Sequence, residues 1–309
     1  IDLISFYALP EDNSIDNILG SITDNNPGVL GEGTSANYID NIWIGTLLSI
    51  NREDGYWIKV SDPVDLEVEG LLTDPATEYS LHQGSNLVSY PFKGSAPIEE
   101  TIPYDAQVSF IGIISEGQSA LYTDDGWLGG LSNLSGTDGY WFINNQAVDF
   151  TFNPPTHLVS RIDSEIKQVP IEFLFSQSTQ QAFYFVESAL IDGESINSDD
   201  LIIAYNGDVI VGSRYWYGET TDIPAMGMDS GNIYSGYANI GDNITFKVLD
   251  ASTNTLIDMD VIGDTRWSNL GMSLITLTKR VVPEVIELGK AYPNPFNPIT
   301  TISFSVPYE

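Results

Sequence analysis

The chain has 309 residues, of which 43 are acidic and 11 basic, giving a formal charge of -32 and a pI near 4.1. Such a surface repels phosphate backbones and anionic lipids, which excludes nucleic acid as a partner. With 42% hydrophobic residues the chain should nevertheless fold, and its length predicts more than one domain.

The sequence contains no cysteine, which excludes disulfides, thiolate metal sites and cysteine nucleophiles. No apolar run approaches the roughly 18 residues of a membrane helix, so we predict no membrane insertion. The sequence starts at Ile1 without a signal segment, and we expect a processed piece of a longer protein. An acidic surface suits salt water or divalent cations, although solubility alone would also explain it.

An internal repeat occupies the first half of the chain. The segment GEGTSANYIDNIWIGTLLSINREDGYWIKV begins at Gly31, and SEGQSALYTDDGWLGGLSNLSGTDGYWFIN begins at Ser115. Both contain DGYW, and Glu116 follows Glu32 by 84 positions. The same offset carries LISF near the start onto LVSY, so no gap is needed. We predict two tandem copies of one module.

Each repeat has the pattern of a β module. Short apolar or alternating runs such as LISFYAL, GYWIKV and VDLEVEG are separated by Gly, Asn, Asp and Pro turns. SIDNILGSI predicts one short helix, with a Ser or Asp cap ahead of Ile15, whereas its counterpart PIEETIP predicts only a turn.

Repeated Trp and Glu residues offer two interpretations. Exposed rings could stack on sugars, but Trp57 and Trp141 lie in predicted strands, where a large ring favours core packing. Trp43 and Trp127 present the same alternative. The carboxylates of Glu32 and Glu116 lie in Gly-rich turns and are expected to accept backbone N–H bonds instead of acting in catalysis.

Residues 157–282 predict a β-sandwich, because strand-like runs alternate with turns such as IDGES and YNGD. Carboxylates and amide carbonyls crowd one region, and they are ligands that Ca²⁺ prefers. The candidate calcium ligands are Asp199, Asp200, Asn206 and Asp208, with Asp222 and Asp229 further along. Asn and Asp are also ordinary turn residues, so the turn interpretation stays open.

Three consecutive aromatic residues in RYWYG are candidate ligand contacts: Tyr215, Trp216 and Tyr217. Side chains alternate between the faces of a strand, so at least one ring should be exposed. Tyr215 or Tyr217 is the better candidate for contact with a glycan or another protein.

The stretch VVPEVIELGKAYPNPFNPITTISFSVP lies at the end of the chain. It resembles the start of the C-terminal sorting domain of type IX secretion cargo in Bacteroidetes-type and related bacteria. The matching motif residues are Tyr292, Pro293, Asn294, Pro295, Phe296, Asn297 and Pro298. A complete domain of this kind is a small β-sandwich, and this sequence stops after one strand. The resemblance implies that secretion machinery exports the parent protein to the cell surface. The upstream modules look like those of surface proteins from the same bacteria.

The prolines of this motif predict a stiff spacer between the sandwich and a last strand. TTISFSV then alternates, which puts Ile302, Phe304 and Val306 on one face. A lone strand cannot bury that face or pair its own backbone. It must add to the remainder of its domain, to its own sandwich or to a neighbouring molecule.

No catalytic pattern accompanies His82 or His157, the two histidines, and both are expected to be incidental. We therefore predict an all-β, non-catalytic, extracellular or cell-surface protein that is structural or adhesive. Its partners would be itself, other surface proteins or glycans, with assembly into a filament by strand addition. The alternatives are an accessory, substrate- or carbohydrate-binding C-terminal region of a larger secreted hydrolase and an autonomous carbohydrate-active enzyme. The predicted units are a first repeat (1–84), a second repeat (85–156), a third unit (157–282), and a linker with the start of the sorting domain (283–309).

Overall fold

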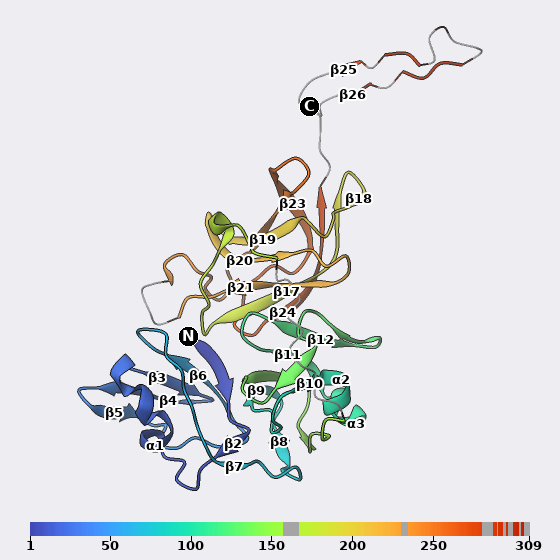
Figure 1. Ribbon diagram of the computed structural model, residues 1–309. Helices are drawn as coiled ribbons and strands as arrows, with labels where there is room; N and C mark the ends of the chain where they lie inside the picture. The colour runs from blue at the N-terminus through green and yellow to red at the C-terminus, as the bar shows by residue number, and fades with distance from the viewer. Residues whose placement is uncertain are drawn as a thin grey trace.

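The computed structural model describes residues 1–156, 167–229, 234–279, 287–288, 290–292, 295, 299–302 and 304–305. It is an all-β protein (Figure 1). The two repeats lie side by side, with the third unit packed against them (Figure 1). His157 lies outside the described residues.

The first repeat forms a five-stranded sheet in the order β1-β6-β3-β4-β5. Its strands are β1 (Asp2–Ser5), β3 (Gly28–Gly31), β4 (Thr34–Ile39), β5 (Ile42–Gly45) and β6 (Gly55–Lys59). All neighbouring strands are antiparallel. One face of this sheet packs on a cluster of apolar side chains that includes Ile18, Leu19 and Val29.

The sheet of the second repeat has the same strand order, written from its other edge as β13-β12-β11-β15-β9. Its strands are β9 (Gly84–Val88), β11 (Phe110–Ile114), β12 (Ser119–Thr123), β13 (Gly126–Leu128) and β15 (Tyr140–Asn144). Leu3 pairs with Trp57 in the first sheet, and Leu87 pairs with Trp141 in the second. The pairing registers therefore differ by the same 84 positions as the sequences.

Both repeats contain short helices. The predicted helix appears as α1 (Ile15–Leu19), followed by the 3₁₀ helix η1 (Gly20–Asn25). Ser14 stands at the N-cap as predicted, although its side chain makes no capping hydrogen bond. The turn prediction for PIEETIP was wrong, since the one-turn helix α2 (Ile98–Thr101) forms there; α3 (Tyr104–Gln107) follows it. Buried Ile98 and Thr101 anchor α2 against the core despite its short length.

Three two-stranded ladders complete the repeats. They are β2 (Ala8–Leu9) with β7 (Leu71–Leu72), β8 (Tyr79–Leu81) with β16 (Val148–Phe150), and β10 (Ser95–Pro97) with β14 (Asn133–Ser135). Strand β8 precedes the boundary predicted at residue 84, yet it pairs with β16 and packs in the core of the second repeat. The second repeat thus uses a strand from upstream of its own sheet.

The third unit is a curled sheet of eight strands, preceded by the 3₁₀ helix η2 (Ile171–Phe173). Its strands are β17 (Gln181–Ile191), β18 (Glu194–Ser195), β19 (Leu201–Asn206), β20 (Val209–Tyr215), β21 (Thr221–Met226), β22 (Thr245–Asp250), β23 (Thr255–Gly263) and β24 (Met272–Lys279). The first half of β23 pairs with β22 and its second half with β24. This shared strand bends the sheet into a sandwich-like shape around a core that includes Tyr184 and Phe246.

The described residues at the C-terminal end form a hairpin of β25 (Glu287–Leu288) and β26 (Phe304–Ser305), separate from the other sheets (Figure 1). Tyr292 and Thr301 also pair, with two N–H···O bonds of 2.9 Å. The prediction of a stiff spacer was therefore wrong, because a spacer would hold these two residues apart. The terminal strand finds its partner in β25, which was not among the partners predicted.

Candidate functional site

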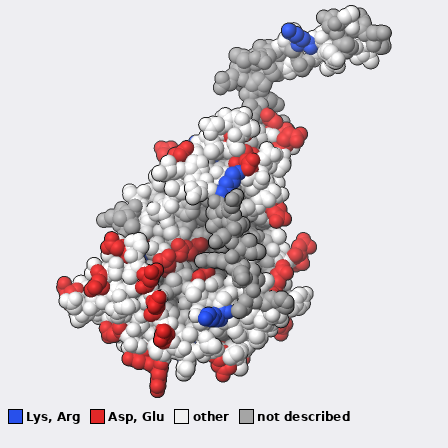
Figure 2. All heavy atoms as spheres, viewed as in Figure 1, with Lys and Arg blue, Asp and Glu red and all other residues white. Residues whose placement is uncertain are grey.

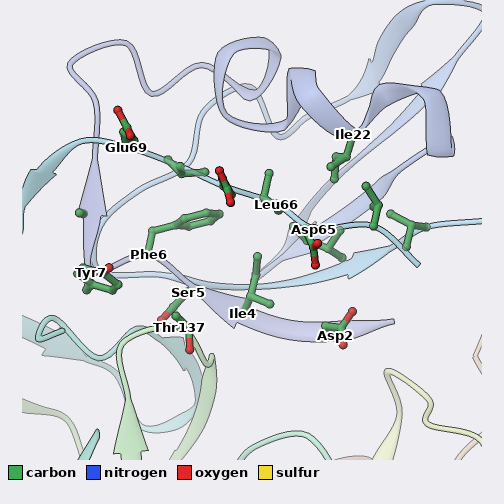
Figure 3. Close-up of a pocket in the computed structure, with 16 residues that line it drawn as sticks. Asp2, Ile4, Ser5, Phe6, Tyr7, Ile22, Asp65, Leu66, Glu69 and Thr137 are labelled. Carbon is green, nitrogen blue, oxygen red and sulfur yellow. The ribbon is translucent and has the colours of Figure 1, made fainter. Parts of the chain in front are cut away.

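A groove runs along the first repeat, between β1 and the segment 64–69 (Figure 3). Its volume is about 580 Å³. Apolar side chains form the floor, among them Ile4, Phe6 and Ile22. Acidic side chains stand at its rim: Asp2, Asp65, Glu67 and Glu69. An apolar floor beneath a negative rim suits an uncharged apolar segment better than an anionic ligand.

The corresponding place in the second repeat is occupied by β8. Tyr79 packs its ring against Phe150 and Phe152, with centroids 6.0 and 5.0 Å away. Its hydroxyl lies 2.9 Å from the Ser89 hydroxyl. Leu81 joins the same apolar cluster. The second repeat therefore completes its core with β8, whose counterpart 84 positions earlier would fall before Ile1.

The two repeats hold each other through reciprocal hydrogen bonds. Glu32 of the first repeat accepts the N–H of Leu87 in the second at 2.9 Å, and Glu116 accepts the N–H of Leu3 at 3.1 Å. The predicted acceptor role of both carboxylates is confirmed, with donors in the opposite repeat. Burial raises the pKa of the Glu116 carboxyl, and the Leu3 N–H opposes that shift.

Equivalent serine and glycine positions make further contacts between the two repeats. Ser5 donates its backbone N–H to Thr137 at 3.0 Å, and Ser89 donates to Glu53 at 2.9 Å. The two donors are 84 positions apart in the sequence, and so are the two acceptors. A Cβ added to Gly139 of the second DGYW would lie 2.8 Å from the Ile4 carbonyl oxygen. A glycine is required there because the two backbones approach too closely for a side chain.

The Trp side chains lie at these contacts instead of on an open face. Trp57 is buried between Leu3 and Leu87, and the partly buried Trp141 packs against the same cluster. Core packing is therefore confirmed for Trp57 and, in part, for Trp141.

The second Trp pair is only partly buried. Trp43 makes an edge contact with the Tyr38 ring at 5.3 Å. Trp127 donates its Nε1–H to Gln107 at 3.1 Å. Both indoles also pack against the core of their own repeat.

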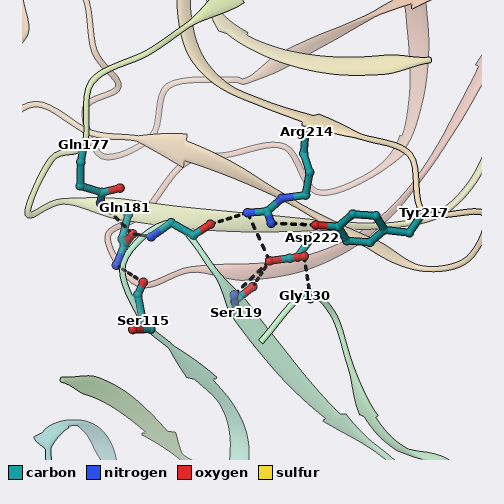
Figure 4. Close-up of polar contacts among 9 residues, drawn as sticks. Ser115, Ser119, Gly130, Gln177, Gln181, Arg214, Tyr217 and Asp222 are labelled. Atoms are coloured by element: carbon teal, nitrogen blue, oxygen red, sulfur yellow. Dashed lines mark hydrogen bonds and ion pairs between the residues drawn. The ribbon is translucent and has the colours of Figure 1, made fainter. Parts of the chain in front are cut away.

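A buried carboxylate joins the second repeat to the third unit (Figure 4). Asp222 on β21 is fully buried and accepts the N–H groups of Ser119 at 2.9 Å and Gly130 at 2.8 Å. The guanidinium of Arg214 lies 3.7 Å from it and also donates to the Gly117 carbonyl. Burial raises the pKa of Asp222, whereas Arg214 and the N–H donors oppose that shift.

Further contacts seal the third unit against both repeats. Phe183 and Phe185 pack against Ile114 and neighbouring apolar residues of the second repeat. Gln181 donates to the Ser115 carbonyl at 2.9 Å (Figure 4). Lys59 of the first repeat forms an ion pair with Asp229, whose side chain is almost fully buried. Sequence reasoning missed these partners because they lie far apart along the chain.

The candidate calcium ligands do not converge. Asp200 precedes β19 and accepts the N–H groups of Asn197 at 2.7 Å and Ala251 at 2.8 Å. Asn206 ends β19, about 20 Å away at roughly 3.3 Å per residue. Its amide donates to Gly236 and Asp242, both at 3.1 Å.

The other two candidates are exposed: Asp199 pairs with Lys167, and Asp208 lies in the turn after β19. The prediction of one site from the four residues was wrong, because they lie at opposite ends of a strand. Within the described ranges no three acidic or histidine side chains are grouped for a metal ion. Calcium binding stays a prediction without an assigned ligand set.

The RYWYG stretch places its rings in three different environments. Trp216 is buried in the core of the third unit, so its assignment as a ligand contact was wrong. Tyr215 is half-buried, with the Lys167 ammonium 4.4 Å from its ring centroid. Tyr217 is 48% exposed and accepts a hydrogen bond from Arg214 at 3.0 Å. Tyr217 is thus the accessible candidate of the three.

The terminal strand exposes its apolar face. Ile302 is 48% exposed and Phe304 71% exposed, while Val306 lies outside the described residues. Two residues of the sorting motif are described by the structure: Tyr292 is exposed, and Pro295 lies at a bend of the backbone. Pro293, Asn294, Phe296, Asn297 and Pro298 lie outside the described residues.

His82 lies at the seam between the repeats, where its Nε2 is 2.8 Å from a Glu32 oxygen. The Gln83 carbonyl and the Glu32 carboxylate raise the pKa of His82. The imidazole supports the Glu32 side chain that binds the second repeat, so its position is structural and not incidental as predicted.

Acidic side chains are spread over the face seen in Figure 2, where basic ones are few. None of the helices in the described part of the chain combines the length and apolar composition needed to cross a membrane. Comparison with family models, curated proteins and solved structures gave no match for this chain.

Proposed function

We propose that this chain is a non-catalytic structural or adhesive protein of the cell surface, which assembles through its terminal strand. The observation that carries the proposal is the exposed apolar face of Ile302 and Phe304 in the hairpin of β25 and β26. Soluble proteins cover or charge the edges of exposed strands, because uncovered edges recruit other chains. Here the strand segment carries no charged residue between 299 and 307.

The rest of the chain supports a load-carrying role. Contacts between the three β units hold them together. The carboxylates of Glu32, Glu116 and Asp222 each accept a backbone N–H of another unit. Such contacts fix the relative orientation of the units, as a structural subunit requires. The sorting motif adds the proposal that the parent protein is exported by type IX secretion machinery.

The test compares assembly of three proteins by light scattering and electron microscopy over rising concentration. The native chain should form particles larger than a monomer. A double variant, Ile302→Ser with Phe304→Ser, should stay monomeric and melt as the native protein does, because both side chains are exposed. The control, Ile240→Ser, removes an isoleucine that is 82% exposed in the third unit and should assemble normally. A monodisperse native monomer at the highest concentration would overturn the proposal.

A further inference from the structure

We infer that strand β5 of the first repeat pairs edge to edge with β5 of a second copy of this chain, as a lateral contact between assembled molecules. The inference rests on the proposed function, because a contact of four residues per strand is weak by itself and needs molecules already held close together. It names a second surface, distinct from the terminal strand. A two-fold contact of this kind joins molecules in pairs.

Strand β5 has a free edge. It is the last strand of its sheet, on the side of the first repeat away from the third unit (Figure 1). Asp40 and Asn41 form the turn that joins it to β4, and both have positive φ, as a two-residue hairpin requires. Thr46 donates its N–H to the Ser35 carbonyl at 2.8 Å, which sets the alternation of bonded and non-bonded pairs along the hairpin. By that alternation Trp43 directs its N–H and C=O away from β4, and within the described residues no hydrogen bond occupies them.

One face of this hairpin is apolar and exposed. Ile39 on β4 and Ile42 and Ile44 on β5 lie on the face opposite the core, and they are 49%, 58% and 51% exposed. Ile39 pairs with Ile42 across the hairpin, so the three side chains form one patch. Strand β5 itself carries no charged residue. An uncharged edge strand beside an apolar patch is the arrangement that recruits another strand.

The second repeat does not share this surface. The counterparts of the three isoleucines, 84 positions later, are Thr123, Gly126 and Leu128. Its hairpin turn carries two exposed carboxylates, Asp124 and Asp125, where the first repeat has only Asp40. Charge at an edge strand opposes pairing with another chain. The apolar edge is therefore a property of the first repeat and not of the module.

The partner that covers the second sheet would not fit the first. In the second repeat, the buried Leu121 packs against Phe183 and Phe185 of the third unit. The counterpart of Leu121 in the first repeat is Asn37, which is polar and exposed. A unit like the third would therefore meet a polar centre, whereas the apolar residues of the first sheet lie at its free edge.

The backbone donors of the first sheet also differ. In the second repeat the N–H of Ser119 binds the carboxylate of Asp222 at 2.9 Å. In the first repeat the equivalent N–H, that of Ser35, donates to the Thr46 hydroxyl at 3.5 Å. The first sheet thus supplies its own acceptor and does not require a carboxylate from a partner. Both differences favour an apolar strand as the occupant.

The edge is complementary to itself. When two β5 strands run antiparallel with Trp43 opposite its own copy, the two residues exchange both N–H···O bonds. Ile42 then stands opposite Ile44 of the second copy, so the two apolar patches join on one face. The molecule carries a formal charge of -32, which opposes most contacts between copies. Here the two Asp40 carboxylates lie about 20 Å apart along the strands, more than twice the Debye length of about 8 Å in physiological salt.

The test uses engineered cysteines, since the native chain has none. Full-length Ile42→Cys and Ile44→Cys proteins, distinguished by isotope labelling, are mixed under assembly conditions and oxidised. Mass spectrometry should show the mixed 42–44 disulfide exceeding either like-with-like disulfide by about tenfold, because opposite residues lie within disulfide reach and diagonal ones, about 7–8 Å apart, do not. Glu194→Cys, on the exposed strand β18, replaces Ile44→Cys as the control and should give no such excess.

A second arm uses charge to show that the surface pairs with itself. One protein carries Ile42→Lys with Ile44→Lys, and another carries Ile42→Glu with Ile44→Glu. Each alone should form particles with about half the native mass per length in electron microscopy, because like charges face each other across the pair. An equal mixture of the two should recover the native value. The control Ile262→Lys, at a position 65% exposed on β23, should assemble like the native chain.

The two proposals fail differently. If native particles form while the mixed disulfide shows no excess and the charged variants match the native mass per length, the lateral contact is wrong and the structural role stands. If no particles form but the mixed disulfide exceeds the others, the edge pairs by itself and assembly through the terminal strand is wrong. If neither forms, both proposals fall.

Discussion

The buried Asp222 carboxylate offers the sharpest energetic test of how the units are joined. An Asp222→Asn substitution keeps the shape of the side chain but leaves one acceptor oxygen for the N–H groups of Ser119 and Gly130. It also leaves the Arg214 guanidinium without its counter-charge, 3.7 Å from the lost carboxylate. Removing one partner of a buried ion pair costs about 3–5 kcal/mol. We expect a loss of that size in the free energy of unfolding.

A matched variant separates charge from hydrogen bonding. Asp200 is also buried and accepts two backbone N–H groups, but none of the ion pairs described involves it. Asp200→Asn should therefore cost about 1–3 kcal/mol, the penalty of an unsatisfied buried donor. In an Asp222→Asn background, Arg214→Met should restore part of the loss because it removes the unpaired cation.

Urea denaturation measures these losses, and amide hydrogen exchange locates them. In Asp222→Asn, the N–H groups of Ser119 and Gly130 should exchange faster. The N–H of Ala204, within β19, reports the stability of the third unit by itself. The reasoning is refuted if Asp222→Asn costs no more than Asp200→Asn, or if Arg214→Met gives no recovery.

Three further predictions concern the seam between the repeats. Gly139→Ala should cost about 1–3 kcal/mol in urea denaturation, because its Cβ would lie 2.8 Å from a backbone oxygen, whereas Gly20→Ala meets no atom within 4 Å and should be neutral or stabilising. Burial raises the pKa of Glu116 above 4.5 in the folded state, so the stability this contributes is complete below pH 4.5 and is lost as pH rises through the folded pKa. Glu116→Gln keeps an acceptor for Leu3 and should make unfolding less dependent on pH in that window; an unchanged pH profile would contradict it. Trp57→Ala should cost about 3–5 kcal/mol in the same assay, and a loss below about 1 kcal/mol would show that the ring is not a core residue.

Much of the fold was predictable because it depends on local patterns. Alternating apolar residues and turn signals indicate strands, and the match of two DGYW segments at one offset predicts two similar sheets, which the strand orders show. Descent from one duplicated module stays a prediction. The sequence misled where short segments gain their structure from packing. The helix α2 forms because Ile98 and Thr101 are buried, although its four residues are too few to favour a helix alone.

The candidate sites were less predictable, for a related reason. Crowding of acids near Asp199 suggested convergence, but a strand carries Asp200 and Asn206 to opposite ends. The partners of Asp222 lie 92 and 103 positions away, so no local pattern marks them. Only the repeated Glu32 and Glu116 carried a usable signal, since a carboxylate kept at equivalent places indicates a shared role.

The exchange of equivalent bonds between the repeats affects how substitutions there should be read. Losing the Glu32 contact leaves the Glu116 contact intact, and the same holds for the Ser5 and Ser89 hydroxyls, which donate to the Gly136 and Arg52 carbonyls. A scan of single changes at these four hydrogen-bonding positions would therefore underestimate what the exchanged bonds contribute together. Only double substitutions, made at both members of an equivalent pair, would show the full contribution of these bonds to stability. The same redundancy would let either repeat change in sequence without separating the two.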